Sequence, residues 1–174
     1  RRATQRTLRL MTSTPPECYT PPCFTPPPST CNMQILLQRT AAKACSIRGG
    51  IAQLAGRKDE DTVACVPSFT GATANDYWAV FDGHRGDNLA QHAAETLHGH
   101  LRDALDGAAP AAAFLDAFAR CHHSAREARY RDGACALCFV NLDGQGWCAN
   151  AGDCRAVLSR HAGHVERLST DHKA

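Results

Sequence analysis

The feature that most constrains the fold is an apolar strand followed, without a linker, by a polar cluster and then a helix. Residues 77 to 81 read YWAVF, which is typical of a buried β-strand, and they lead directly into Asp82-Gly83-His84. From Asp87 onward an apolar side chain recurs every fourth residue, which predicts one face of an amphipathic helix. We therefore expect a carboxylate, a backbone carbonyl and an imidazole to emerge together at a strand end.

A second β-like stretch, residues 62 to 69, follows a charged turn that ends in Glu60 and Asp61. A loop of small residues separates this stretch from the Tyr77 strand, so we predict a hairpin that brings both acids close to Asp82. Carboxylate and carbonyl oxygens are the ligands that Mg²⁺ and Mn²⁺ prefer, commonly with several waters retained. Acids on turns are also often plain solvated surface, so from these residues alone both interpretations stay open.

The remaining pattern predicts an α+β fold with a mainly antiparallel sheet. One helix is expected from Asp87 to about Leu105, and a second from Pro110 to about Arg129, opening with proline in its first turn. Strands come before and after this helix pair, an order that is typical of α+β proteins. The other expected strands cover residues 47 to 54, 134 to 142, 147 to 150, 155 to 159 and 165 to 168.

The first 44 residues are basic and then rich in proline, with almost no aliphatic side chains between residues 12 and 31. Such a segment cannot bury enough surface to offset its ordering entropy, so we expect residues 1 to 44 to be a disordered leader. A proline-rich ligand for an aromatic groove and an organellar transit peptide are alternatives for it. The domain is expected to occupy residues 45 to 174. Because the chain begins with Arg1 and not methionine, we expect a fragment or a conceptual translation.

Charge and cysteine content narrow the classes of partner and compartment. A formal net charge of +2 gives no strong case for nucleic acid or an anionic membrane, and no apolar run approaches the ~20 residues of a membrane span. The 10 cysteines are scattered and no signal peptide accompanies them, which favours reduced thiols in a cytosolic or nuclear protein. A disulfide framework is the alternative. We expect a monomer. Cys135 and Cys138 have the spacing of half a zinc knuckle, but on a strand they would face opposite sides.

Five segments, taken in order, resemble the metal-dependent serine/threonine protein phosphatases of type 2C. They read GRKDED, AVFDGH, DGACAL, ANAGDCRAVL and LSTDHKA, and the resemblance covers about residues 45 to 174. It implies a layered α-β-β-α sandwich with mainly antiparallel sheets, of which this chain would supply the N-terminal part and remain incomplete at its C-terminus. It also implies an enzyme that hydrolyses phosphoserine and phosphothreonine in phosphoprotein substrates.

The resemblance assigns the acids to two divalent ions, Mg²⁺ or Mn²⁺. Asp82 would bridge the two ions, Glu60 and the Gly83 carbonyl would complete one site, and Asp61 would orient bound water. A water made acidic by both cations would attack the phosphorus in line, without a covalent enzyme intermediate. A dinuclear site suits phosphate monoester hydrolysis, which is among the slowest uncatalysed reactions.

The resemblance also implies catalytic roles for two basic side chains. His84 would protonate the departing alkoxide as general acid, and Arg57 would hold the substrate phosphate through its planar fork. Arg57 lies one residue nearer the acidic pair than the usual pattern has its arginine. Arg85 stands where the family commonly has a small residue, and it could contact phosphate instead.

Other departures concern the strand start and the end of the chain. Ala134 and Cys135 replace residues that carry hydroxyls in the family, while Asp132 is a candidate for an outer metal contact and Asp153 for a structural acid. The family places two more metal-binding aspartates downstream of the DHK segment, whereas this sequence ends at Ala174. If the chain were complete, we would expect weak catalysis or none. The alternatives are thus a phosphatase-like binding or regulatory module and, without the resemblance, a thiol-rich redox or zinc protein.

Overall fold

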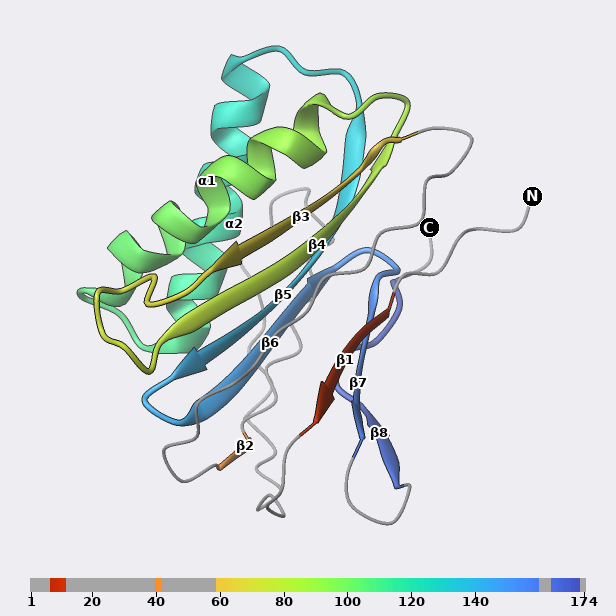
Figure 1. The fold of residues 1–174 in the computed structure, drawn as a ribbon. Coiled ribbons are helices and arrows are strands. Elements are labelled where there is room, and N and C mark those ends of the chain that lie inside the picture. The colour runs from red at the N-terminus through yellow and green to blue at the C-terminus, as the bar shows by residue number, and fades with distance from the viewer. Residues whose placement is uncertain (1–6, 12–39, 42–58, 160–163, 173–174) are drawn as a thin grey trace.

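The computed structural model describes residues 7–11, 40–41, 59–159 and 164–172. These residues form three layers: a helix pair, a five-stranded sheet and a three-stranded sheet (Figure 1). The fold is therefore α+β with mainly antiparallel sheets, as the sequence predicts, and three of the four expected layers lie within the described residues. The strand predicted over residues 47 to 54 and the start of the domain near residue 45 lie outside them.

The five-stranded sheet is built from two hairpins and one short edge strand. All its neighbouring strands pair antiparallel. The β5–β6 hairpin turns at Asp143 and Gly144, whose φ angles of 50° and 80° suit the Asp-Gly pair that the sequence places there. The strands, in the order in which they lie in the sheet, are β2 (Thr40–Ala41), β6 (Gln145–Ala151), β5 (Gly133–Leu142), β4 (Asp76–His84) and β3 (Asp61–Val66).

The three-stranded sheet consists of β1 (Thr7–Met11), β7 (Arg155–Ser159) and β8 (Val165–Arg167), in that order. Strand β1 pairs parallel with β7, and β8 pairs antiparallel with it. Both β1 and β2 come from the segment expected to be a disordered leader, and the extent of that leader stays a prediction. The sequence TLRLM alternates polar and apolar residues, and pairing with β7 supplies its backbone partners. The rest of the leader lies outside the described residues.

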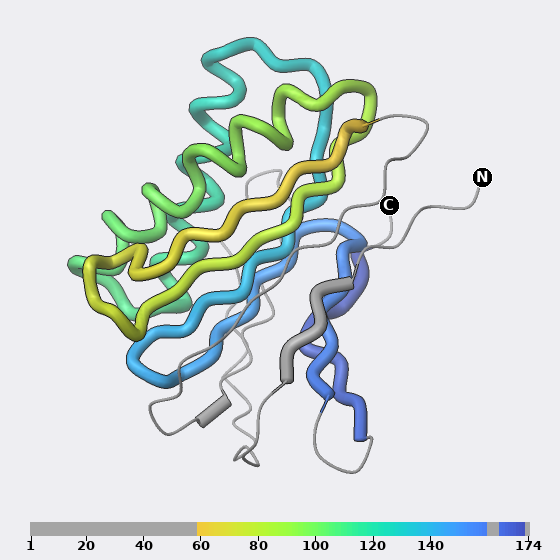
Figure 2. Tube along the Cα trace, viewed as in Figure 1, coloured from red at the N-terminus to blue at the C-terminus, as the bar shows by residue number. Residues whose placement is uncertain are grey.

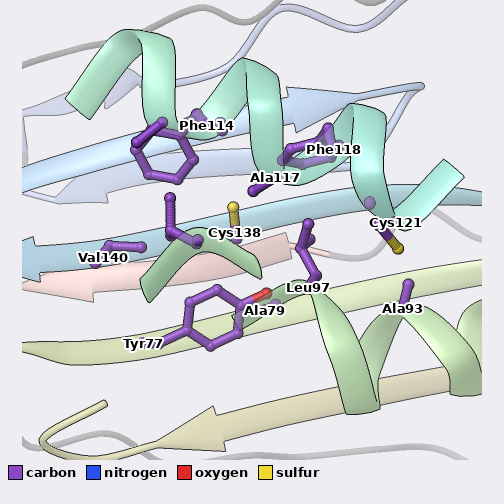
Figure 3. Packing of buried hydrophobic residues seen from close by; sticks show 14 of the residues in the cluster. Tyr77, Ala79, Ala93, Leu97, Phe114, Ala117, Phe118, Cys121, Cys138 and Val140 are labelled. Atoms are coloured by element: carbon purple, nitrogen blue, oxygen red, sulfur yellow. The ribbon is translucent and has the colours of Figure 1, made fainter. Parts of the chain in front are cut away.

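Two helices, α1 (Asn88–Leu105) and α2 (Pro110–Glu127), cover one face of the five-stranded sheet (Figure 1). Both bounds of α1 agree with the prediction within one residue, and α2 ends two residues earlier than predicted. The four-residue spacing in α1 correctly picks out Ala93, Leu97 and Leu101 as buried residues. Figure 3 shows α2 facing Ala93 and Leu97 across the core. The buried face of α2 carries Phe114, Phe118, Cys121 and Ala125.

Alternation along the central strands creates two apolar cores, one on each side of the five-stranded sheet. In β4 the fully buried Tyr77 and Phe81 face the helices, whereas Trp78 faces the three-stranded sheet. Strand β5 repeats the pattern, so its sequence is apolar almost throughout, as expected for a strand covered on both faces. Trp78 and Phe139 are register partners whose ring centroids lie 6.1 Å apart. Figure 2 shows β7 and β8 on the side of the larger sheet opposite the helices.

The thiols and imidazoles fall into different environments. In the described part of the chain the six cysteines are free thiols, as expected, and Cys138 is fully buried in the helix-side core. His98 and His100 are both half-buried, and the ring centroids of His98 and Tyr77 lie 5.9 Å apart. They lie where α1 packs against the sheet and α2, which the spacing alone did not show.

Within the described ranges no helix combines the length and hydropathy needed to cross a bilayer.

We expect the protein to lose stability at alkaline pH through its buried thiols. Burial raises the pKa of Cys148 from 9.0 to about 12. The Cys148 thiol therefore loses its proton at a lower pH in the unfolded chain than in the folded protein. As a result, its contribution to stability is complete below pH 9 and is lost as pH rises toward 12. One such group contributes at most about 1.4 kcal/mol per pH unit. Urea unfolding at several pH values should show a shallower alkaline decline for Cys148→Ala than for the exposed-site control Cys65→Ala; equal slopes would contradict this account.

Candidate active site

Two acids and a thiol form one transverse row across the five-stranded sheet. Asp61 of β3 pairs with Asp82 of β4, which pairs on its other side with Cys135 of β5. Register partners project from the same face of a sheet, and alternation places this row on the face that carries Trp78, away from the helices. The predicted hairpin therefore does bring Asp61 and Asp82 together at one edge.

A third acid joins this row from the turn after β6. The Cys135 thiol donates to Asp153 Oδ1 at 3.4 Å. The pKa of Cys135 is raised to about 11, mainly by burial, with added contributions from the carboxylates of Asp153 and Asp82. The pKa of Cys154 rises to about 12, again mainly through burial, with added contributions from Cys135 and from the carboxylates of this cluster. Both thiols are therefore protonated and pack among the acids. The first residues of β5 carry no hydroxyl group.

Glu60 reaches across the end of β4 and contacts the backbone there. Its Oε1 accepts a hydrogen bond from the Gly86 N–H at 2.9 Å, and its carbonyl accepts one from the Gly83 N–H at 3.1 Å. The approach is close enough that a Cβ on Gly83 would overlap the Glu60 carbonyl oxygen and lie 3.0 Å from that of Gly86. Because the Glu60 backbone lies so close, only glycine fits at position 83. The hydrogen bond from Gly83 in turn holds the Glu60 backbone beside it.

His84 is the last residue of β4 and is exposed at the rim of the sheet. The sequence predicts that the strand stops before Asp82-Gly83-His84, whereas the structure includes all three in the strand, paired with β5. By alternation His84 lies on the same face as Asp82. The ring extends over β5 at Gly133, its register partner.

Of the two candidate phosphate ligands, the structure describes Arg85 but not Arg57. Arg57 lies outside the described residues, so its role stays a prediction. Arg85 follows His84, is exposed, and has a φ of 67°, in the left-handed region that few residues other than glycine, asparagine and aspartate adopt. This conformation ends the strand and turns the chain toward α1, with Arg85 at the outside of the turn.

Asp132 binds the first turn of α1 from outside the helix. Its Oδ2 accepts a hydrogen bond from the Leu89 N–H at 3.0 Å, whereas the positional N-cap, Asp87, makes no side-chain bond to the helix backbone. Desolvation would raise the pKa of Asp132, but hydrogen bonds from Leu89 and Asn88 outweigh it and the pKa is lowered. One oxygen of the Asp132 carboxylate is thus bound to the helix start, and the outer metal contact expected for this residue stays a prediction.

Asp132→Ala should therefore destabilise the protein by about 1 to 2 kcal/mol, as expected for a lost cap, while Asp87→Ala should change stability by less than about 0.5 kcal/mol. The lowered pKa means that the capping contribution is present above pH 4 and is lost as pH falls below it. Chemical unfolding of the two variants at pH 7 and pH 3 checks both statements. A larger loss for Asp87→Ala than for Asp132→Ala would contradict the assignment.

The segment near the chain's end braces the turn that carries Asp153. The His172 N–H donates to the Gly152 carbonyl at 2.9 Å, and the Asn150 side-chain amide donates to the Thr170 carbonyl at 2.8 Å. Asp171 accepts hydrogen bonds from Arg155 at 2.5 Å and 3.3 Å, and from Arg167 at 2.6 Å. Two motifs separated in sequence, ANAGDCRAVL and LSTDHKA, thus form one structural unit beside the acid row.

The candidate ligands at this rim are carboxylate and carbonyl oxygens, the atom type that hard divalent cations bind. Asp61 and Asp82 share a row, and the Gly83 carbonyl and the Glu60 carboxylate lie at the same strand ends. Among residues 59–159 and 164–172, however, no group of three or more such side chains is already arranged to hold a metal ion. The metal-binding roles of Glu60, Asp61, Asp82 and Gly83 therefore stay predictions.

Two contributors to this site carried no clear sequence signal. Gly133 lies beneath the His84 ring, and Asp132 caps a helix that begins 44 positions earlier, at Asn88. Both depend on the pairing of β4 with β5, which joins segments on either side of the helix pair. The sequence shows a glycine at the start of β5, but it does not show that this glycine pairs with His84.

Comparison with known proteins shows which family and which solved fold the chain is similar to. The family model described as protein phosphatase 2C matches residues 47–174. Probable protein phosphatase 2C 14 of Arabidopsis thaliana is 35% identical over 130 residues, covering 71% of this chain and 29% of that protein. The integrin-linked kinase-associated serine/threonine phosphatase 2C of Bos taurus is 29% identical over 153 residues, covering 72% of this chain and 41% of that protein. The chain thus spans less than half the length of these relatives.

A solved structure shows the same fold. The structure described as that of a C. elegans sex determining protein matches with a TM-score of 0.57 and 18% identity, covering 83% of this chain and 36% of that one. Its likeness bears on architecture alone. The match of the family model over residues 47–174, together with the fold and the acid row, shows that this chain belongs to the protein phosphatase 2C family.

Proposed function

We propose that the protein hydrolyses phosphoserine and phosphothreonine in phosphoprotein substrates, with the rim of β3, β4 and β5 as its active site. The single observation that carries the proposal is the row of Asp61 and Asp82 on one face, with His84 two residues further along β4. The family is metal-dependent, and the family match supports this chemistry at the matching residues.

Asp82, Glu60, Asp61 and the Gly83 carbonyl are the residues that would hold divalent cations, which we propose to be two ions of Mg²⁺ or Mn²⁺. When bound, such ions acidify water and neutralise phosphoryl oxygens. The protein keeps its own share of the site in place: Gly83 fixes the backbone of Glu60, and the β-ladder fixes Asp61 beside Asp82.

His84 would supply the proton that the leaving group needs. The water oxygen forms a bond to phosphorus, the bond from phosphorus to the serine or threonine oxygen breaks, and that oxygen takes a proton from the His84 imidazolium. A proton released by the attacking water restores the charge balance. The exposed position of His84 at the rim allows contact with a protein substrate. General acid catalysis of this kind typically contributes about 10² to 10⁴ in rate.

The substrate phosphate needs a cationic partner as well. We propose that Arg57 or Arg85 supplies it, because a guanidinium can bind two phosphate oxygens at once. Arg85 is exposed directly beside His84, which supports its access to a phosphate at the rim. We place the protein in the cytosol or nucleus, a proposal supported by the free thiols in the described part.

The test is hydrolysis of a phosphoserine peptide by the intact protein with Mn²⁺ and with Mg²⁺, and after removal of metal with a chelator. We expect turnover that requires the added ion. A single turnover in ¹⁸O-labelled water should place one labelled oxygen in the released phosphate. Absence of turnover with ion binding retained would instead favour a phosphatase-like binding module, and ion-independent turnover would exclude the mechanism.

A further inference from the structure

The ring of His84 lies directly over a glycine. His84 ends β4 and pairs with Gly133, which begins β5, so both residues point to the same face of the sheet. A Cβ built on Gly133 would stand 2.6 Å from Cε1 and 2.9 Å from Cδ2 of His84, and closer still to Nε2. Real Cβ atoms essentially never approach a neighbour within 3.0 Å. The imidazole therefore occupies the space that any side chain at position 133 would need.

The backbone itself does not require glycine at position 133. The described glycines with a positive φ are Gly71, Gly86, Gly144 and Gly152, and Gly133 is not among them. Alanine could therefore adopt this backbone conformation, and its Cβ would clash only with the His84 ring. Gly99, within α1, provides the contrast, because a Cβ there would meet nothing within 4 Å.

The rim has a second contact of the same kind. A Cβ on Gly152 would lie 2.7 Å from Cβ of Cys135, whose thiol bonds to Asp153. Gly152 has a φ of 101°, so there the backbone also favours glycine. At Gly133 the close contact with His84 is the sole reason for glycine that the described residues provide.

Within the part of the chain that the structure describes, little else holds the His84 ring. The side chain is exposed, and among the described residues its imidazole has no hydrogen-bond partner. An exposed side chain normally samples several rotamers. We propose that Gly133 is a positioning residue, whose missing side chain lets the His84 ring lie back across β5 on the face that carries Asp82. This inference rests on the proposed function only in taking His84 as the proton donor.

The proposal predicts a dependence on the leaving group. Serine leaves phosphorus as a strongly basic alkoxide and needs the proton, whereas a nitrophenol leaves as a stable anion and does not. A methyl group at position 133 would take the place of Nε2 and push the ring outward. Because the ring is the end of a flexible side chain, the fold should tolerate the change while the ring moves.

The experiment compares Gly133→Ala, His84→Gln and their double variant in the intact protein, with Gly99→Ala as the matched control. We expect Gly133→Ala to lower kcat on a phosphoserine peptide about tenfold or more, and kcat on p-nitrophenyl phosphate by less than about threefold. The double variant should be no slower than His84→Gln, because both changes remove one function. Gly99→Ala should leave both activities unchanged.

A nuclear magnetic resonance measurement tests the positioning without any turnover. In the wild type the Hα resonances of Gly133 should carry a ring-current shift that His84→Gln abolishes, and Gly133→Ala should move the His84 ring resonances. Unchanged ring resonances together with unchanged peptide turnover in Gly133→Ala would overturn the proposal. If the wild type turned over neither substrate, the proposed function would fail, and the resonances alone would decide whether Gly133 positions His84.

Discussion

Replacing Asp82 by asparagine should abolish ion-dependent phosphopeptide hydrolysis while leaving the protein folded. Asp82 stands in the middle of the row, paired with Asp61 on one side and Cys135 on the other. Asparagine keeps the shape of the side chain but removes the negative charge that a divalent cation requires. Divalent ions contribute several kcal/mol of transition-state stabilisation, so kcat/KM should fall by about a thousandfold or more.

The control for Asp82→Asn is Asp143→Asn. Asp143 is exposed in the β5–β6 turn with a φ of 50°, a conformation that asparagine adopts readily. Activity should survive this change. Isothermal titration with Mn²⁺ gives a second measure, and Asp82→Asn should bind the ion at least about tenfold more weakly, a loss of about 1.4 kcal/mol. Full activity of Asp82→Asn would show that the acid row is not the catalytic centre.

Gly83→Ala should cause the largest loss of stability of any conservative substitution at the rim. The added methyl would overlap the Glu60 carbonyl oxygen, and both atoms belong to backbone that is fixed by pairing. Relief requires β3 and β4 to separate at this end, which breaks the hydrogen bond from Gly83 to Glu60. Overpacking together with a lost bond should cost about 3 kcal/mol, or roughly 6 to 12 °C in Tm for a chain of this size.

Gly99→Ala is again the matched control, because it adds the same methyl group where a Cβ meets nothing within 4 Å. In the middle of α1 this change should raise stability by up to about 1 kcal/mol. Thermal unfolding followed by circular dichroism distinguishes the two. A Tm for Gly83→Ala within a degree or two of the wild type would mean that the rim is more compliant than the contacts at Gly83 indicate.

The elements that the sequence predicts well are those with a clear period. The four-residue spacing identified α1, and the apolar run from Tyr77 identified β4 as a buried strand. The β5–β6 turn at Asp143 and Gly144 falls between the strands predicted over residues 134 to 142 and 147 to 150. In each case local preference and tertiary packing favour the same structure, so local information was sufficient.

What the sequence could not supply was long-range register. The pairing of His84 with Gly133 joins residues 49 positions apart across two helices, and no local pattern encodes it. The same holds for Asp132, which appears in the sequence as a turn residue and acts in the structure as a cap. Strand β1 was missed because composition dominated the analysis of the leader, whereas its partner β7 lies far along the chain. The proposed roles of Glu60, Asp61, Asp82 and His84 remain predictions that the variants above can test.

The bond from the Leu89 amide to Asp132 ties the beginning of one helix to the beginning of a distant strand. That amide can exchange its hydrogen with solvent only when the two segments come apart, so fraying of the helix and detachment of the strand's first residues become a single event. Since His84 and Gly133 lie within that strand pairing, the lifetime of the closed state would set how long the imidazole keeps its orientation.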